Sequence, residues 1–315
     1  MQGNSRGNSK HKNPGLCWKL LVAIVIVTVA SLFALNASRP GQSVVGCAEG
    51  CAAPVKRLAG PLRIVTLNML HGFPLFKNLP LRLDLIAAEL QHLDADIVLL
   101  QETPWTVRTG YGAEYLAKQL GYNYLYYRAN GNHALIFFEE GEAILSRFAL
   151  EDPIFTELEP RVGWFESRVS LGATAITPWG EVTVFVTHLT DKDPVVRAGQ
   201  VDSLRQFMET HKGEITLAAG DFNSDEASPA IAELARLWSD TYRMRHPAEP
   251  GLTCCIDNLT NGPSEPLEER IDYIFMLPGG GKLVDSERVF DQPFPVAGGW
   301  QWASDHIGLM AEIEP

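Results

Sequence analysis

The segment Gly220-Asp221-Phe222-Asn223 follows an apolar run over residues 215–219 and places a carboxylate and an amide where that run ends. An apolar run that stops at glycine predicts a buried strand, and α/β folds bind their ligands at such strand ends. Residues i and i+2 of an extended segment share a face, so Asp221 and Asn223 are expected to project together. The alternative is an Asx-rich turn, which Gly, Asp and Asn also form.

The same pattern recurs along the chain, which favours the strand over the turn. Two apolar runs, 62–67 and 96–100, flank a segment with helical periodicity over 81–93, as in a strand, a crossover helix and a second strand. The polar residues at the ends of the predicted strands are Asn68, Glu102, His188, Asp221, Asn223, Asp272, Asp305 and His306. Many strands with few helices predict an α/β fold of two packed sheets flanked by helices.

These residue types suit cleavage of a phosphoester, which needs a metal to neutralise its oxygens and a base for the attacking water. Glu102 offers a hard oxygen ligand for Mg²⁺, and Asp272 or Asp305 would complete its shell. Asp221 would orient or deprotonate the water.

The remaining polar residues would hold the substrate. The amides of Asn68 and Asn223 are suited to holding the water and the phosphate, and His188 and His306 are candidate donors to phosphoryl oxygens. A carboxylate behind an imidazole would keep it charged, but the sequence does not show which aspartate supports which histidine.

The chain resembles the endonuclease/exonuclease/phosphatase superfamily, DNase I-like proteins that include nucleases, inositol-phosphate phosphatases and neutral sphingomyelinases. The resemblance covers residues 61–315 and rests on six ordered motifs: Thr66-Leu67-Asn68, Gln101-Glu102-Thr103, Thr187-His188-Leu189, Gly220-Asp221-Phe222-Asn223, Arg270-Ile271-Asp272-Tyr273 and Ser304-Asp305-His306. It implies a four-layer α/β/β/α sandwich and Mg²⁺-dependent attack of water, with Mn²⁺ as a substitute.

The resemblance also implies roles for single residues. Glu102 would be the metal ligand, with Asn68 and Asp305 beside it, and Asp221 the base. The phosphate contacts would be His306 and His188, and Asp305 or Asp272 would share the metal or support a histidine.

Three features outside these motifs are less specific. Relatives often place Asn after Gly where this chain has Gly141-Glu142, and we interpret Glu142 as a surface strand residue rather than a substrate contact. His71 is either a phosphate contact, as in some relatives, or an ordinary loop histidine. The adjacent Cys254 and Cys255 are interpreted as packed core.

The first sixty residues differ from the rest of the chain. A basic head, residues 1–19, precedes an uncharged stretch over 20–38, which as a helix would span roughly 28 Å, close to the ~30 Å core of a bilayer. We predict a single-pass membrane anchor with the body on the non-cytoplasmic side, because basic residues precede the stretch. A cleaved signal peptide is the main alternative and would give an exported form; a lipoprotein signal at Cys47 fits less well. Residues 39–60 are predicted to be a linker and residues 61–315 the catalytic domain.

The charge distribution bears on nucleic-acid substrates, and the cysteine content bears on disulfide bonds and zinc. Residues 1–60 hold seven of the 26 basic residues and one of the 38 acidic ones, so residues 61–315 are strongly acidic and nucleic acid is a less favoured substrate. A bound divalent cation can invert the local field, so a nuclease is not excluded. In an exported domain Cys47 could pair with Cys51, or either of them with Cys254 or Cys255, and the sequence does not choose between these pairings. The spacing does not favour zinc.

Three hypotheses follow. The first is a membrane-tethered, metal-dependent phosphodiesterase acting on a phospholipid head group or another small phosphoester. The second is an exported Mg²⁺-dependent endonuclease. The third is a non-catalytic binding module on the same fold, which the full set of eight polar residues argues against. No sequence feature indicates a protein partner.

Overall fold

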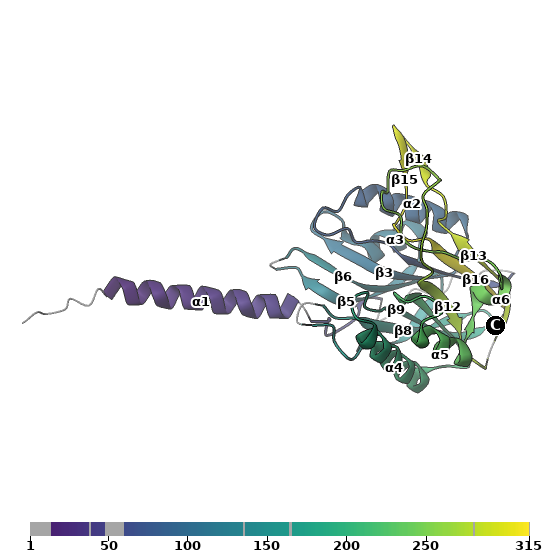
Figure 1. The fold of residues 1–315 in the computed structure, drawn as a ribbon, viewed down its shortest axis with the longest axis horizontal. Coiled ribbons are helices and arrows are strands. Elements are labelled where there is room, and N and C mark those ends of the chain that lie inside the picture. Colours follow the sequence, from purple (N-terminus) through teal and green to yellow (C-terminus); the bar gives the residue numbers. More distant parts are fainter. Residues whose placement is uncertain are drawn as a thin grey trace, which may run out of the picture.

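The computed structural model describes residues 14–37, 39–47, 60–134, 136–163, 166–279 and 281–314. Two mixed β-sheets pack face to face (Figure 1). Sheet A contains, from edge to edge, β1 (Val45–Gly46), β5 (Asn123–Asn132), β6 (Phe138–Ser146), β3 (Ile97–Thr106), β2 (Leu62–Asn68), β16 (Gly308–Glu314) and β13 (Lys282–Val289), with β4 (Gly110–Tyr111) paired to β3. Sheet B contains β11 (Ser239–Asp240), β12 (Asp272–Met276), β10 (Ile215–Asp221), β9 (Gly180–His188), β8 (Val169–Thr177) and β7 (Ala149–Glu157).

Helices cover the outer faces of the two sheets, and a small hairpin of β14 (Phe294–Val296) and β15 (Gly299–Gln301) stands at one end (Figure 1). α2 and α3 pack on sheet A, and α4 and α5 pack on sheet B. The helices are α1 (Pro14–Ala37), α2 (Leu79–His92), α3 (Gly112–Leu120), α4 (Pro194–His211), α5 (Pro229–Leu237) and α6 (Thr241–Arg245). The layers are therefore helix, sheet, sheet and helix, as predicted.

Three apolar cores hold these layers together. Ile64 and Val184 belong to the core between the sheets, Leu83 to the core under α2, and Leu204 to the core under α4. Each of these side chains is fully buried. A buried aliphatic side chain of this size contributes about 1.5–3 kcal/mol, so the sandwich is a rigid support for the residues at its edge.

Local sequence signals set the helix boundaries. Asp193 precedes α4 and its Oδ1 accepts from the backbone N–H groups of Val195 and Val196 at 2.8 and 3.2 Å. α3 ends at Gly121, which adopts the left-handed conformation that glycine tolerates best. The helical segment predicted at 81–93 corresponds to α2.

The N-terminal segment lies mostly apart from the sandwich (Figure 1). α1 covers most of the predicted anchor at 20–38. Among the described residues, no helix is both long enough and apolar enough to cross a membrane. The anchor and the non-cytoplasmic placement of the body stay predictions. Part of the predicted linker is packed on sheet A, since Gly41 N donates to Arg128 O at 2.8 Å and β1 pairs with β5. Residues 1–13 and 48–59 lie outside the described residues.

Candidate active site

Strand ends from both sheets meet at one edge of the sandwich. β2 and β3 are parallel and pair Asn68 with Gln101, and β9 and β10 are parallel and pair His188 with Asp221. β12 runs antiparallel to β10 and begins at Asp272, opposite Asp221. Parallel neighbours end on the same edge of a sheet, so the polar residues predicted from the sequence are brought together here.

Gly220 allows the close approach of β10 to β9. Its φ is +152°, and a Cβ atom at this position would lie 1.9 Å from the carbonyl oxygen of Thr187. Any other residue would therefore push the two strands apart. The glycine that precedes Asp221 is thus a requirement of the strand pairing that places this carboxylate next to His188.

Asn68 connects the two sheets at this edge. Its Nδ2 donates to Asp221 Oδ2 at 3.0 Å and to Glu102 Oε1 at 3.3 Å, while Leu70 N donates to its Oδ1 at 3.1 Å. The side chain is buried. One amide therefore fixes two carboxylates that come from different sheets.

A β-bulge turns Glu102 into the site. The pairing of β3 with β6 shifts register between Leu100 and Thr103, and Glu102 has a φ of +52°. Bulges re-aim side chains and are common next to active sites, and a left-handed conformation at a non-glycine residue costs of order 1–3 kcal/mol. The fold keeps this strained conformation at the position predicted to bind the metal.

His71 keeps Glu102 ionised. The backbone N–H of His71 donates to Glu102 Oε2 at 3.1 Å, and its ring Nε2 lies 3.4 Å from the same oxygen. Burial opposes ionisation, but His71, His306 and Asn68 together outweigh it and lower the pKa of Glu102. Glu102 is therefore a charged carboxylate at neutral pH, and His71 lies at the site rather than in a distant loop.

Asp221 lies at the centre of the group. Its Oδ2 is 3.3 Å from His188 Nε2 and 3.8 Å from His306 Nε2, and Asn223 N donates to its Oδ1 at 2.8 Å. Burial raises the pKa of Asp221 to about 7, against the opposing effect of His306. A carboxylate with a pKa near neutrality is suited to accept a proton from water.

Asp272 is the carboxylate that supports His306. His306 Nδ1 lies 2.9 Å from Asp272 Oδ2, and both residues are buried. Burial disfavours the imidazolium, but Asp272, Asp221 and Asp305 outweigh burial and raise the pKa of His306 well above its ordinary value. His306 is therefore a charged donor, which answers the question that the sequence left open.

His188 differs from His306. Burial, Arg168 and His306 lower the pKa of His188 well below its ordinary value, so its ring is neutral. Asn223 Nδ2 lies 3.0 Å from His188 Nε2 and donates to Leu189 O at 2.9 Å. The buried Nδ1 of His188 has no hydrogen-bond partner among the described residues. Of the two histidines predicted as a pair, His188 is therefore neutral and His306 positively charged.

Asp305 is placed by Ser304 and Arg82. Ser304 Oγ donates to Asn68 O at 2.5 Å and lies 3.2 Å from Asp305 Oδ1. The buried Arg82 donates to the carbonyl oxygens of Met69 and Ala303 at 2.7 and 3.1 Å, which ties together the two loops that carry Asn68 and Asp305. Burial raises the pKa of Asp305, and Glu102 adds to this effect.

The donor set fits a divalent cation. Glu102, Asn68 and Asp305 offer carboxylate and amide oxygens, which Mg²⁺ prefers. A second group, Asp221, Asp272 and His306, has its ligand atoms within 4.8 Å of one another. In this second group Asp272 and His306 also bond to each other at 2.9 Å.

Sequence reasoning missed three charged residues beside the site. Glu140 and Glu142 on β6 are buried, and Arg168 interacts electrostatically with Glu140, Glu102 and Asp221. The interpretation of Glu142 as a surface residue is wrong, since it is 1% exposed. β6 is buried along its whole length, so no alternation of polar and apolar residues could show which side chains point inward.

Replacing Glu142 by Gln should stabilise the metal-free protein. Burial and the nearby Glu140 raise the pKa of Glu142 well above its ordinary 4.5, and its Oε2 has no hydrogen-bond partner in the described part of the chain. The folded state holds a proton that the unfolded chain releases, so stability falls as pH rises above about 4.5. We expect E142Q to gain about 1–3 kcal/mol in free energy of unfolding near pH 7.5 and little near pH 4.5.

Urea unfolding in EDTA at these two pH values measures the effect. Glu139→Gln is the matched control, because this buried carboxylate on the same strand is paired with Arg128 at 2.8 Å and should lose stability when neutralised. If E142Q were no more stable than the wild type near pH 7.5, the buried carboxyl group of Glu142 would not destabilise the folded protein, and the prediction would be wrong.

The cysteine pair lies next to His306. Cys254 and Cys255 are joined by a disulfide bond, and Cys254 Sγ is 3.5 Å from His306 Nε2. Cys254 is buried, as predicted for a packed core, but Cys255 is exposed. This bond removes one of the pairings that the sequence left open, that of either residue with Cys47 or Cys51, and Cys51 lies outside the described residues.

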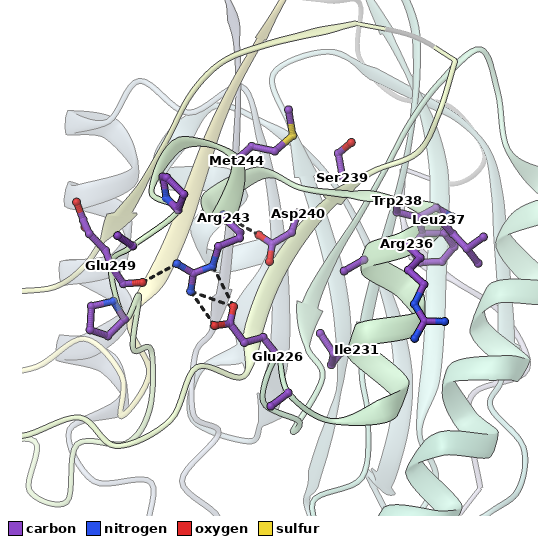
Figure 2. Close-up of a pocket in the computed structure, with 15 residues that line it drawn as sticks. Glu226, Ile231, Arg236, Leu237, Trp238, Ser239, Asp240, Arg243, Met244 and Glu249 are labelled. Atoms are coloured by element: carbon purple, nitrogen blue, oxygen red, sulfur yellow. Dashed lines mark hydrogen bonds and ion pairs between the residues drawn. The ribbon is translucent and has the colours of Figure 1, made fainter.

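Two cavities flank the site. One of about 240 Å³ is lined by His71 and Glu102, and one of about 440 Å³ is lined by Leu70 and Asp305. A larger hollow of about 1000 Å³ lies near α5 and α6, and none of the described site residues lines it. Figure 2 shows the ion pair between Arg243 and Glu226 inside this hollow, where Arg243 Nη2 is 2.9 Å from Glu226 Oε2.

Two packed mixed sheets that join carboxylates, an amide and histidines at one edge define a hydrolase-type α/β fold. The sequence profile of the Endonuclease/Exonuclease/phosphatase family matches residues 65–306, which is well over half of the chain. The chain belongs to this family, as its motifs predicted. No curated protein sequence matches the chain.

Solved structures share the fold. The mannosyl-6-phosphatase of Bacteroides thetaiotaomicron has a TM-score of 0.65 and 20% identity over 81% of this chain and 100% of its own. A family protein from Leptotrichia buccalis gives 0.62 and 19%, over 81% and 100% of the two chains. TDP2 from C. elegans gives 0.62 and 16%, over 81% and 75%. At these identities the likeness concerns the fold alone.

Proposed function

We propose that the protein is a metal-dependent phosphoester hydrolase, and specifically a phosphodiesterase that acts on a lipid head group or another small phosphoester. The observation that carries the proposal is the group formed by Asn68, Glu102, Asp221, Asp272 and His306. It supplies an ionised ligand, a base and a charged donor within one buried cluster. A divalent cation bound here would neutralise the phosphoryl oxygens.

Two residues of the chain would then carry out the proton transfer and the stabilisation of the developing charge. Asp221, oriented by Asn68, accepts a proton from the attacking water. His306, held as imidazolium by Asp272, donates to a phosphoryl oxygen as negative charge develops on it. The family membership and the mannosyl-6-phosphatase neighbour support phosphoester chemistry in general.

The cavity next to Asp305 supports a substrate with an apolar part. Ile256 and Leu259 line it together with Phe73 and Leu75, and the last two are 44% and 71% exposed. Charged residues, among them Lys77, Arg82 and Asp257, line the rest of the cavity, so these apolar side chains form one wall that can accept an aliphatic or acyl-glycerol group. This favours a lipid-derived phosphodiester over nucleic acid, which the acidic body also disfavours.

The test uses the purified, metal-stripped full chain with Mg²⁺, Mn²⁺ or EDTA. The substrates are bis-p-nitrophenyl phosphate, sphingomyelin, phosphatidylinositol and supercoiled plasmid. We expect metal-dependent turnover of the aryl diester and of a lipid, and no turnover in EDTA. Plasmid nicking without lipid turnover would replace the phosphodiesterase by an exported nuclease. Turnover of none of the four would leave a binding module on this fold.

A further inference from the structure

The cavity beside Glu102 is lined by polar and charged side chains alone. In the described part of the chain no apolar side chain lines it, and the lining residues are His71, Glu102, Asn130, Glu140, Glu166, Arg168, Asp191 and Lys192. Its volume of about 240 Å³ is below the roughly 300–1,000 Å³ of typical apolar ligand pockets. We call this cavity the polar well. Two of its residues, His71 and Glu102, also belong to the candidate active site, so a group bound here would be attached to the reacting phosphate.

The charges of the polar well are largely paired with one another. Arg168 Nη2 lies 2.9 Å from Glu166 Oε1 and 3.7 Å from Asp191 Oδ1, and Lys192 Nζ contacts Glu166 Oε2. A quaternary ammonium group would meet the guanidinium of Arg168, and a second anion would meet the carboxylate of Glu140. Neither kind of charge is favoured, while an apolar group would strip water from charged walls without replacing its hydrogen bonds.

Donors and acceptors nevertheless alternate around the well. Asn130 Nδ2 donates to Glu140 Oε1 at 2.5 Å and to Ser167 O at 3.0 Å, which fixes this carboxylate. Behind it, Glu142 is buried with Oε2 unpartnered among the described residues, and it interacts electrostatically with Glu140 and Arg168. Vicinal hydroxyl groups both donate and accept, so they can bond carboxylates and a guanidinium at once.

We propose that the polar well binds the uncharged, polyhydroxylated group of the substrate, a sugar or cyclitol esterified to the phosphate that the active site cleaves. This inference rests on the proposed function and names its substrate class. Together with the apolar wall of the cavity at Asp305, it describes a phosphodiester that joins a polyol on one side to an apolar alcohol on the other.

The experiment compares three substrates on the full chain in Mg²⁺: glycerophosphoinositol, glycerophosphocholine and bis-p-nitrophenyl phosphate. We expect kcat/KM to be highest for the inositol diester among the two glycerol diesters, by about tenfold, the size of one hydrogen bond. Asn130→Ala should lower kcat/KM for the inositol diester about tenfold more than for the aryl diester. Glu151→Gln, an exposed carboxylate on β7, is the matched control and should change neither.

The outcomes separate the two proposals. Turnover of the aryl diester with equal rates for inositol and choline diesters would overturn the polar-well assignment and leave the hydrolase standing. Without any turnover the proposed function fails, and binding decides the inference: inositol 1-phosphate should raise the thermal midpoint of the wild type more than phosphocholine does, and Asn130→Ala should remove the difference. Equal shifts for both ligands would overturn it.

Discussion

Asp221→Asn should lower kcat for phosphoester hydrolysis by about 10²–10⁴, the contribution of a positioned general base. The amide has the shape of the carboxylate and can still accept the 2.8 Å hydrogen bond from Asn223 N. It cannot take a proton from water at neutral pH. The change therefore removes the chemical role of Asp221 and keeps the shape of the side chain, and it also removes the bond that Asn68 Nδ2 donates to Asp221 Oδ2 at 3.0 Å. Steady-state hydrolysis of bis-p-nitrophenyl phosphate in saturating Mg²⁺ measures the loss.

Asp225→Asn is the matched control for this substitution. Asp225 lies four residues further along the same segment, is exposed, and accepts from Ala227 N and Ser228 N at 2.8 and 2.9 Å. It contacts none of the described site residues in these bonds, so kcat should stay within about twofold of the wild type. If D221N kept wild-type kcat while D225N did too, the base would have to be another group, and the assignment of Asp221 would be wrong.

The sequence predicted the edge of the sandwich well, because local patterns determine it. An apolar run that ends in a polar residue is visible within ten residues, and parallel pairing of β2 with β3 and of β9 with β10 brings such ends together. The positions of Asn68 and Asp221 follow from this rule, as does the fold of two sheets between helices.

What the sequence did not predict depends on contacts between distant segments. Asp272 and His306 are 34 residues apart, and no local pattern distinguishes this pairing from one with Asp305. The bulge at Glu102 depends on the register between β3 and β6. Glu142 was misplaced because a strand buried on both faces lacks the period-two alternation that reports burial.

The unequal histidines show the same limit in electrostatic terms. His188 and His306 are both buried histidines, and nothing in the sequence around them distinguishes their charge states. Both lie near Asp221, but His306 has a second carboxylate, Asp272, at 2.9 Å, whereas burial and the cation Arg168 lower the pKa of His188. Charge at the site is thus set by partners that folding supplies.

Glu102→Gln should raise the Mg²⁺ concentration for half-maximal activity by at least about 10–100-fold, the loss reported for groups that only support a ligand. Gln keeps one oxygen, which can accept from His71 N as Glu102 Oε2 does at 3.1 Å, and it loses the weaker 3.3 Å bond that Asn68 Nδ2 donates to Glu102 Oε1. It lacks the negative charge that His71 preserves in the wild type. The substitution therefore tests charge, with little change in shape.

Titration of activity with Mg²⁺ and calorimetric titration of the metal-stripped chain with Mn²⁺ measure this effect independently. Glu114→Gln is the control, because Glu114 is paired with Lys118 at 2.7 Å on the surface of α3, and its loss should leave both titrations unchanged. An unchanged half-saturation in E102Q would place the cation elsewhere, and the group of Asp221, Asp272 and His306 would become the metal site. In that case Asp221 would be a ligand, and the large loss expected from D221N would reflect missing metal, which added Mg²⁺ should partly restore. With the cation at Glu102, added Mg²⁺ should not restore D221N at all.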